Sequence, residues 1–223
     1  MSSLELCVST RNRHKLEELR ALLSPIGSFD VVTAEAAGVP DVEETGATFL
    51  DNAVLKAAAA FRVTGGLCLA DDSGLAVDAL GGAPGVFSAR FSGPDATAES
   101  NNAHLLQALE GVVDPARTAA FVCHLALVVP GPVASRVGDD LPATPHPDLP
   151  PGAALYALAG RVAGRILSAP RGAGGFGYDP LFLHPPSAQT FAEMAQGAKN
   201  AVSHRGRALQ QLATLLRSLR SAP

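Results

Sequence analysis

Residues 67–80 read Leu-Cys-Leu-Ala-Asp-Asp-Ser-Gly-Leu-Ala-Val-Asp-Ala-Leu. An apolar run stops at two adjacent carboxylates, Asp71 and Asp72, and a second apolar run follows Ser73 and Gly74. This pattern predicts a strand, a tight acidic loop and a second strand. Two carboxylates at a strand end repel each other unless a cation lies between them. A divalent cation such as Mg²⁺ takes oxygen ligands and often binds phosphates too, whereas the alternative is a solvated acidic turn.

The composition indicates a globular protein and excludes some classes of binding partner. The chain has 223 residues, 47% of them apolar, which suits a single domain with a substantial core. Its formal net charge of −4 predicts no general electrostatic binding of nucleic acid. No apolar run approaches a membrane span and the N-terminus does not resemble a signal peptide, so we expect no membrane contact and a cytoplasmic location. The three cysteines lie in apolar runs and are expected to be buried free thiols.

Apolar periodicity predicts alternating strands and helices. Strands are expected at 4–8, 29–33, 67–70, 75–80, 121–129 and 156–166, and helices after Asn12 and at 48–63, 97–109 and 205–219. On the second helix, Asn52 and Lys56 share a face that differs from the apolar one. Alternating helices and strands favour an α/β fold with a mixed twisted sheet flanked by helices. We see no internal domain boundary, so residues 1–223 are expected to form one domain.

One segment differs from the rest in composition. Residues 130–151 contain seven prolines without apolar periodicity. This composition is typical of a flexible surface insertion between two strands.

Two turns near the N-terminus carry charges suited to a phosphorylated ligand. Residues 9–15 place Arg13, His14 and Lys15 in the first turn of a helix, where the helix dipole disfavours cations unless an anion binds there. Residues 43–46 form a second acidic turn before a helix, and together with Asp71 and Asp72 they could complete a magnesium site. A solvated basic turn and ordinary acidity at a helix start are the alternatives.

A glycine-rich loop and a basic helix start lie in the C-terminal half. Residues 172–180 combine four glycines with Phe176, Tyr178 and Asp179, so a purine ring could stack on either aromatic side chain. His204 and Arg205 open the last helix with cationic donors for an anion or a base. A structural turn and a solvated helix start are the alternatives for these segments.

Taken together, these segments resemble the non-canonical purine nucleoside triphosphate pyrophosphatases, the inosine triphosphatase family. The resemblance rests on blocks in the family order: Thr10-x-Asn12-x-x-Lys15, Glu43-Glu44-Thr45-Gly46 with Phe49-x-x-Asn52-Ala53-x-x-Lys56-Ala57, Ala70-Asp71-Asp72-Ser73-Gly74-Leu75, Pro84 to Phe91, Gly174 to Pro180, and Ser203-His204-Arg205-Gly206. Asp51 departs from the glutamate usual before Asn52, and the proline-rich insertion is longer than expected.

The resemblance implies hydrolysis of inosine, deoxyinosine and xanthosine triphosphates (ITP, dITP and XTP) to the monophosphate and pyrophosphate with Mg²⁺. It implies two lobes with a nucleotide cleft between them, and a homodimer. It assigns Mg²⁺ to Glu43 and Asp72, with Glu44 left open as the alternative to Glu43, and activation of the attacking water to Asp72. The implied substrate-binding residues are Thr10, Arg11, Asn12, Arg13, His14, Lys15, Lys56, Ser73, Phe176, Gly177, Tyr178, Asp179, Lys199, His204 and Arg205.

Selectivity for these bases requires a donor opposite the purine C6 oxygen. Adenine has an amino group at C6, so it would leave such a donor unpaired, at a cost of about 1–3 kcal/mol. Two other functions share part of the pattern: a pyrophosphatase for other modified nucleotides, and a non-catalytic nucleotide-binding module. The carboxylates of residues 43–46 together with Asp71 and Asp72 could hold a catalytic magnesium ion, which argues against the non-catalytic module.

Overall fold

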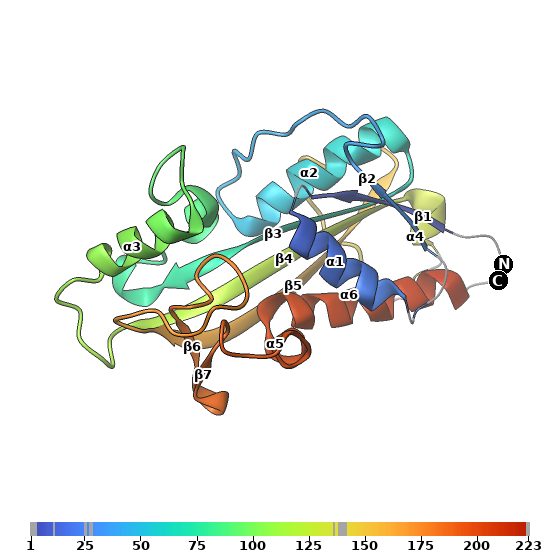
Figure 1. Ribbon diagram of the computed structural model, residues 1–223. Coiled ribbons are helices and arrows are strands. Elements are labelled where there is room, and N and C mark those ends of the chain that lie inside the picture. Colours follow the sequence, from blue (N-terminus) through green and yellow to red (C-terminus); the bar gives the residue numbers. More distant parts are fainter. Residues whose placement is uncertain are drawn as a thin grey trace. The chain divides into compact units, whose positions relative to one another are not determined.

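The computed structural model describes residues 4–10, 12–24, 26, 29–135, 137 and 142–221. In chain order the elements are β1 (Leu4–Ser9), α1 (Arg13–Leu23), β2 (Phe29–Thr33), α2 (Phe49–Thr64), β3 (Leu67–Val77), the 3-10 turns η1 (Asp78–Leu80) and η2 (Gly85–Arg90), α3 (Ala98–Ala108), β4 (Thr118–Pro130), α4 (Gly131–Ala134), β5 (Ala153–Ile166), β6 (Phe182–His184), the 3-10 turn η3 (Pro185–Ser187), β7 (Gln189–Thr190), α5 (Gln196–Val202) and α6 (His204–Ser221) (Figure 1).

The strands that the structure describes form one seven-stranded sheet in the order β2-β1-β3-β4-β5-β6-β7. β1 pairs in parallel with β2 and β3, whereas β6 is antiparallel to β5 and β7. The sheet is therefore mixed and helices flank it, so the predicted α/β fold class is confirmed. The expected nucleotide cleft stays a prediction.

The chain divides into two compact units. The first comprises residues 1–72, 124–159 and 208–223, and the second comprises residues 73–123 and 160–207. β3, β4 and β5 each contribute residues to both units.

The first unit packs helices on both sides of its strands, with α2 and α6 on opposite sides (Figure 1). Because side chains alternate along a strand, Cys7 and Cys68 share a core with the small residues of α2, among them Ala53, Val54 and Ala57. α2 begins with a capping box, in which Thr48 and Asp51 bond reciprocally, and ends at Thr64 with Gly65 as its C-cap. The three cysteines are buried thiols outside any disulfide among the described residues, as expected.

The second unit has a core rich in aromatic residues. Phe121, Phe182 and Phe191 pack together with ring centroids 4.6–5.7 Å apart. Tyr178 and Leu181 belong to the same buried cluster. This core fixes the segment that follows the glycine-rich loop.

The prediction of an acidic loop between two short strands is wrong. β3 runs without interruption from Leu67 to Val77 and includes Asp71, Asp72, Ser73 and Gly74. Both aspartates are buried, at 9% and 8% exposure. Lysine side chains from two helices neutralise them, so the acidic pair can stay inside a central strand instead of turning out to solvent.

The other predicted strands and helices are confirmed to within a few residues, and short elements were missed. α5, β6 and β7 carry too few residues for a periodic signal. Thr190 and Glu193 make the reciprocal bonds of a capping box, but they close a turn and not a helix start. Within the described residues, no helix combines the length and apolarity needed to cross a membrane.

The described part of the proline-rich insertion is attached to the first unit. The N–H of Thr144 donates to the carbonyl of Leu155 over 2.7 Å. His146 Nε2 lies 3.3 Å from Asp51 Oδ1 at the start of α2, and Leu149 packs against the core beside that helix. Residues 136 and 138–141 lie outside the described residues.

Candidate active site

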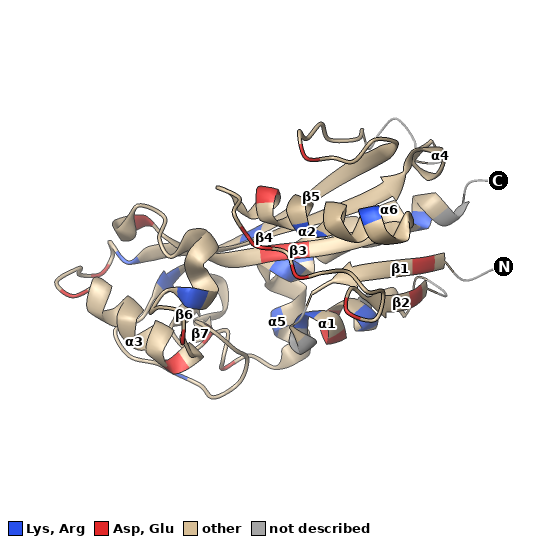
Figure 2. Cartoon of the chain, turned by 90° about the horizontal axis from the view of Figure 1, so that it is seen from above, with Lys and Arg blue, Asp and Glu red and all other residues tan. Residues whose placement is uncertain are grey.

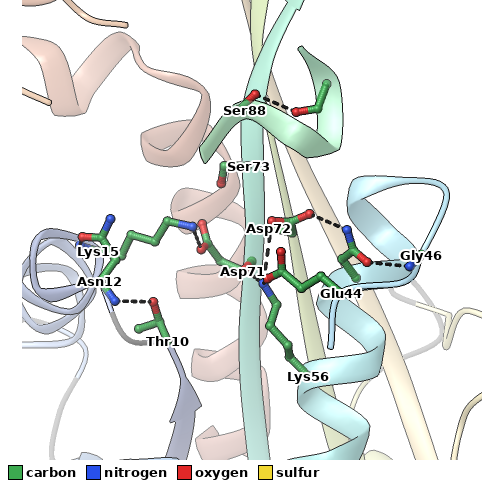
Figure 3. Close-up of polar contacts among 12 residues, drawn as sticks. Thr10, Asn12, Lys15, Glu44, Gly46, Lys56, Asp71, Asp72, Ser73 and Ser88 are labelled. Carbon is green, nitrogen blue, oxygen red and sulfur yellow. Dashed lines mark hydrogen bonds and ion pairs between the residues drawn. The ribbon is translucent and has the colours of Figure 1, made fainter. Parts of the chain in front are cut away.

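The acidic pair of β3 lies within reach of two lysines from different helices. Lys15 of α1 forms an ion pair with Asp71. Lys56 Nζ of α2 lies 2.6 Å from Glu44 Oε1, 2.8 Å from the carbonyl oxygen of Asp71 and 3.7 Å from Asp72 Oδ1 (Figure 3). The cluster therefore joins three carboxylates to two ammonium groups and carries an excess of one negative charge.

The start of α1 is organised by short polar contacts that position Lys15. Asn12 Oδ1 accepts the N–H of Lys15 over 3.3 Å, which is an N-cap contact at the start of the helix expected after Asn12. The N–H of Asn12 in turn donates to Thr10 Oγ1 over 3.2 Å. Arg11 and the side chains of Arg13 and His14 lie outside the described residues. Figure 2 shows acidic and basic positions interspersed along α1, while the acidic segment lies in the middle of β3.

The structure distinguishes the two glutamates of the acidic turn. Glu44 is half-buried and forms an ion pair with Lys56, which also faces Asp72. Glu43 is exposed to solvent. The assignment of Glu43 as a metal ligand stays a prediction, but the geometry brings Glu44 to the cluster.

A buried amide also contacts Asp72. Asn52 is fully buried, and its Nδ2 donates to Asp72 Oδ2 over 3.2 Å. Its Oδ1 accepts the N–H of Gly46 over 2.8 Å (Figure 3). Helical spacing in the sequence places Asn52 and Lys56 on one face of the helix, but it indicates no role for Asn52.

Burial and charge shift the pKa values of this cluster. Burial raises the pKa of Asp72, although the Lys56 ammonium and the Asn52 amide act against the rise. Burial alone would lower the pKa of Lys56, but the carboxylates of Asp72 and Glu44 outweigh it and raise that pKa. Lys56 is therefore a permanent cation at neutral pH, while Asp72 is a better proton acceptor than an exposed aspartate.

The second unit holds a cluster built around the glycine-rich loop. Lys199 Nζ of α5 lies 2.5 Å from Asp179 Oδ2, and both side chains are buried. The N–H of Phe176 donates to the same carboxylate over 2.8 Å. Lys199 Nζ and the guanidinium of Arg205 lie 4.7 and 5.7 Å from the centre of the Phe176 ring. Burial raises the pKa of Asp179, and the Lys199 ammonium opposes the rise.

Further contacts tie the loop and the last helix to the rest of this unit. Arg205 donates to Ser73 Oγ over 3.4 Å, and the ring of His204 stacks on Phe121 with centroids 4.8 Å apart. Asn102 Nδ2 of α3 donates to the carbonyl of Gly177, which has a positive φ of 58°. A Cβ at Gly175 would lie 2.1 Å from Asp179 Oδ2, so the loop can close on this carboxylate only with glycine there.

Of the two aromatic residues in the loop, only Phe176 lies near the charged groups. Tyr178 is 4% exposed, belongs to the core and donates its hydroxyl to the carbonyl of Ser88 over 2.9 Å. A purine could therefore stack on Phe176, which is half-buried, but not on Tyr178 without displacing core residues. The sequence could not separate the two, because both are aromatic residues in one flexible segment.

A model of the Ham1 family matches residues 6–215. The chain belongs to the Ham1 family. That match spans residues of both units and includes every sequence block that carries the family resemblance.

The relatives of this Ham1-family chain match it over nearly their whole length. A dITP/XTP pyrophosphatase of Geobacter sulfurreducens is 47% identical over 207 residues, which cover 93% of this chain and 94% of the relative. The dITP/XTP pyrophosphatase of Escherichia coli K12 is 42% identical over 214 residues, which cover 96% of this chain and 98% of the relative. Among solved structures, a HAM1 protein from Coxiella burnetii superposes with a TM-score of 0.81 at 40% identity, covering 96% of this chain and 98% of the other.

Proposed function

We propose that this Ham1-family chain hydrolyses non-canonical purine nucleoside triphosphates, namely ITP, dITP and XTP, to the monophosphate and pyrophosphate in the presence of Mg²⁺. Relatives of 42–47% identity named dITP/XTP pyrophosphatases support this activity. The observation that carries it is the buried cluster in which Lys15, Lys56 and Asn52 surround Asp71 and Asp72.

The donor set of this cluster fits a magnesium ion. Within the described residues, no three His, Cys, Asp or Glu side chains gather as an all-protein metal cage. Mg²⁺ is usually held by one or two carboxylates together with water and substrate phosphates. We propose that Asp72 and Glu44 supply those carboxylates, with Glu44 in place of Glu43. The ion would neutralise charge that develops on the phosphate oxygens during the reaction.

The polyphosphate is assigned to the lysines and to the start of α1. Lys15 and Lys56 bring two positive charges to the cluster, and both now pair with carboxylates. If those carboxylates bound a cation, the two lysines could pair with phosphate oxygens instead. Phosphate oxygens are negatively charged, as the carboxylates are. The backbone N–H groups at the start of α1 and the basic residues Arg11, Arg13 and His14 complete the proposed phosphate site.

Asp72 is proposed to position and deprotonate the attacking water. Water attacks the α-phosphorus, a new P–O bond forms, and the bond to the bridging oxygen breaks, so pyrophosphate leaves. The water proton passes to the carboxylate of Asp72, whose raised pKa favours that transfer at neutral pH. Lys15 and Lys56 stabilise the negative charge on the departing pyrophosphate.

The base and sugar are assigned to the cluster of the second unit. Phe176 offers a ring face, and Lys199, His204 and Arg205 supply donors close to it. Gly177, Tyr178 and Asp179 shape the loop, and Ser73 is within reach of Arg205. Because hypoxanthine and xanthine carry an oxygen at C6, a donor such as the Arg205 guanidinium would pair with them and be left unpaired by adenine.

Two further expectations belong to this proposal. We expect a homodimer from the resemblance to the family, and a cytoplasmic location because cysteines outside disulfides are typical of a reducing compartment. A pyrophosphatase for other modified nucleotides is the alternative activity, and a binding module without turnover is the alternative class.

A substrate panel tests the proposal. Purified protein is incubated with ITP, dITP, XTP, ATP, GTP and a modified pyrimidine triphosphate, with Mg²⁺ or with a chelator, and pyrophosphate and orthophosphate are measured separately. We expect pyrophosphate from the first three only, and only with Mg²⁺. Orthophosphate release, or equal rates with ATP, would contradict it, and binding without turnover would favour the non-catalytic module.

A further inference from the structure

Helices α2 and α3 begin with the same arrangement of residues. Each has a threonine N-cap in a capping box, Thr48 and Thr97, and each carries a buried asparagine four residues after the cap. These asparagines, Asn52 and Asn101, are 0% and 6% exposed. The Oδ1 atom of each accepts a backbone N–H from the preceding loop over 2.8 Å, from Gly46 and from Ser92.

This backbone contact fixes the orientation of each amide. A backbone N–H can only donate, so the oxygen of the side chain must face it and the NH₂ group must face the other way. In α3 the NH₂ group of Asn101 points to the carbonyl oxygens of Ser88 and Ala89, at 3.4 and 3.1 Å. In α2 the NH₂ group of Asn52 points to Asp72 Oδ2 at 3.2 Å. The same arrangement at a helix start thus directs the amide NH₂ group to backbone carbonyls in α3 and to a side-chain carboxylate in α2.

We propose that Asn52 is a positioning residue for hydrolysis, which fixes the carboxylate of Asp72 and ties it to the acidic turn that carries Glu44. This inference rests on the proposed function of the cluster. Asn52 does not contact the reacting atoms in this account, and it acts through Asp72.

The two oxygens of Asp72 then have different roles. Asn52 occupies Oδ2, while Oδ1 faces Lys56 at 3.7 Å. A carboxylate held at one oxygen cannot rotate freely about its χ2 torsion, so the other oxygen keeps a constant direction. A fixed direction is what a group that orients water or a metal ion requires, and loss of such supporting contacts typically costs 10–100-fold in metal affinity or activity.

The acidic turn is attached to α2 at two successive helical turns. Asn52 holds the backbone of Gly46, and Lys56, one turn later, holds the carboxylate of Glu44. A Cβ at Gly46 would lie 2.6 Å from Cβ of Asp51 and 2.7 Å from Oδ1 of Asn52, so the turn closes tightly on the helix start. One amide therefore links both carboxylates that we assign to the metal.

The experiment compares Asn52→Ala with Asn101→Ala, a matched control at the same helix position with the same loop contact. Three quantities are measured: thermal stability, kcat and KM with ITP, and the affinity for Mn²⁺ alone by electron paramagnetic resonance without nucleotide. We expect both variants to lose stability. Only Asn52→Ala should lose roughly 10–100-fold in kcat and in Mn²⁺ affinity, with a much smaller change in KM.

A second variant separates the contact to Asp72 from the contact to the loop. Asn52→Asp keeps an oxygen for the N–H of Gly46 but replaces the donor that faces Asp72. Measured above pH 7, it should stay as impaired in kcat as Asn52→Ala. Recovery of kcat in Asn52→Asp would show that only loop anchoring matters and would overturn the proposal. Equal losses of kcat in the Asn52 and Asn101 alanine variants, or unchanged Mn²⁺ affinity in Asn52→Ala, would overturn it too.

The Mn²⁺ measurement keeps this inference separate from the proposed function. If the wild-type protein fails to release pyrophosphate from ITP, the proposed activity fails. The comparison of Mn²⁺ affinities between wild type and the two alanine variants still decides whether Asn52 positions the carboxylates.

Discussion

Asn52 and Lys56 lie one turn apart on α2, and both reach the carboxylate of Asp72: Nδ2 of Asn52 is 3.2 Å from Oδ2, and Nζ of Lys56 is 3.7 Å from Oδ1. A neutral donor and a cation thus hold the two oxygens of one buried acid. Burial raises the pKa of Asp72, and these two contacts oppose the rise while they hold the carboxylate in one orientation.

Asp72→Asn should remove most activity and leave the fold intact. Asparagine keeps the shape but cannot accept the water proton, so we expect kcat to fall more than tenfold, about 1.4 kcal/mol or more. Burial raises the pKa of Asp72 above its ordinary 3.8, so the unfolded chain releases this proton first as the pH rises past 3.8, and above the pKa of the folded carboxyl its ionisation opposes folding in full. The melting temperature at pH 7 should therefore not fall. A folded variant that keeps over a tenth of wild-type kcat would remove Asp72 from the mechanism.

Lys56→Gln should destabilise the protein, and Mg²⁺ should offset part of the loss. Without the ammonium, the half-buried Glu44 and the buried Asp72 remain as neighbouring carboxylates, and because water still reaches Glu44, we expect a loss of at most about 3 kcal/mol. A divalent cation would restore positive charge between them. Urea unfolding with Mg²⁺ and with a chelator measures the difference. Arg62→Gln, on the exposed side of the same helix, should show little change in either condition, and an equal loss for Lys56→Gln with and without Mg²⁺ would argue against a metal at these carboxylates.

Arg205→Ala should damage substrate discrimination more than chemistry. The guanidinium can donate to a C6 oxygen but not to the amino group of adenine, so its loss should lower kcat/KM for ITP by about 1–3 kcal/mol and leave the low ATP rate almost unchanged. The ratio of the two kcat/KM values measures this effect. Arg207→Ala, at an exposed position two residues later, is the control. A parallel fall for both nucleotides would assign Arg205 to phosphate binding or to stability.

Tyr178→Phe should cost stability at neutral pH, and the cost should shrink in alkali. The buried hydroxyl donates to the Ser88 carbonyl, a bond of about 0.5–1.5 kcal/mol. Burial raises the pKa of Tyr178 above 10.0. Above pH 10 the unfolded chain releases the phenol proton while the folded protein keeps it, so the stability gained from Tyr178 declines as the pH rises.

Unfolding of wild type and Tyr178→Phe at pH 8 and above pH 10 measures that difference. The chain has two tyrosines, so Tyr156→Phe leaves Tyr178 as the sole phenol in an absorbance titration. Ionisation of Tyr178 in the folded protein near pH 10 would contradict its place in the core.

The sequence by itself determined most of the longer helices and strands, and it determined which residue types could form the two charged clusters. Periodic apolar positions defined the helices that became α2, α3 and α6, because burial of one helical face repeats every three to four residues. The same spacing placed Asn52 and Lys56 on one face. Motif order gave the family resemblance, which the match over residues 6–215 confirms.

The tertiary structure decided which of these residues meet. Lys15 and Asp71 are 56 positions apart, and only the packing of α1 beside β3 pairs them. That pairing lets the acidic segment continue as a strand, where local residue preferences predicted a loop. Glu44 and not Glu43 reaches Lys56, and Tyr178 and not Phe176 enters the core, although both members of each pair are chemically alike. Neighbouring residues of one type cannot be told apart by sequence pattern, because burial and partner contacts depend on segments distant in the chain.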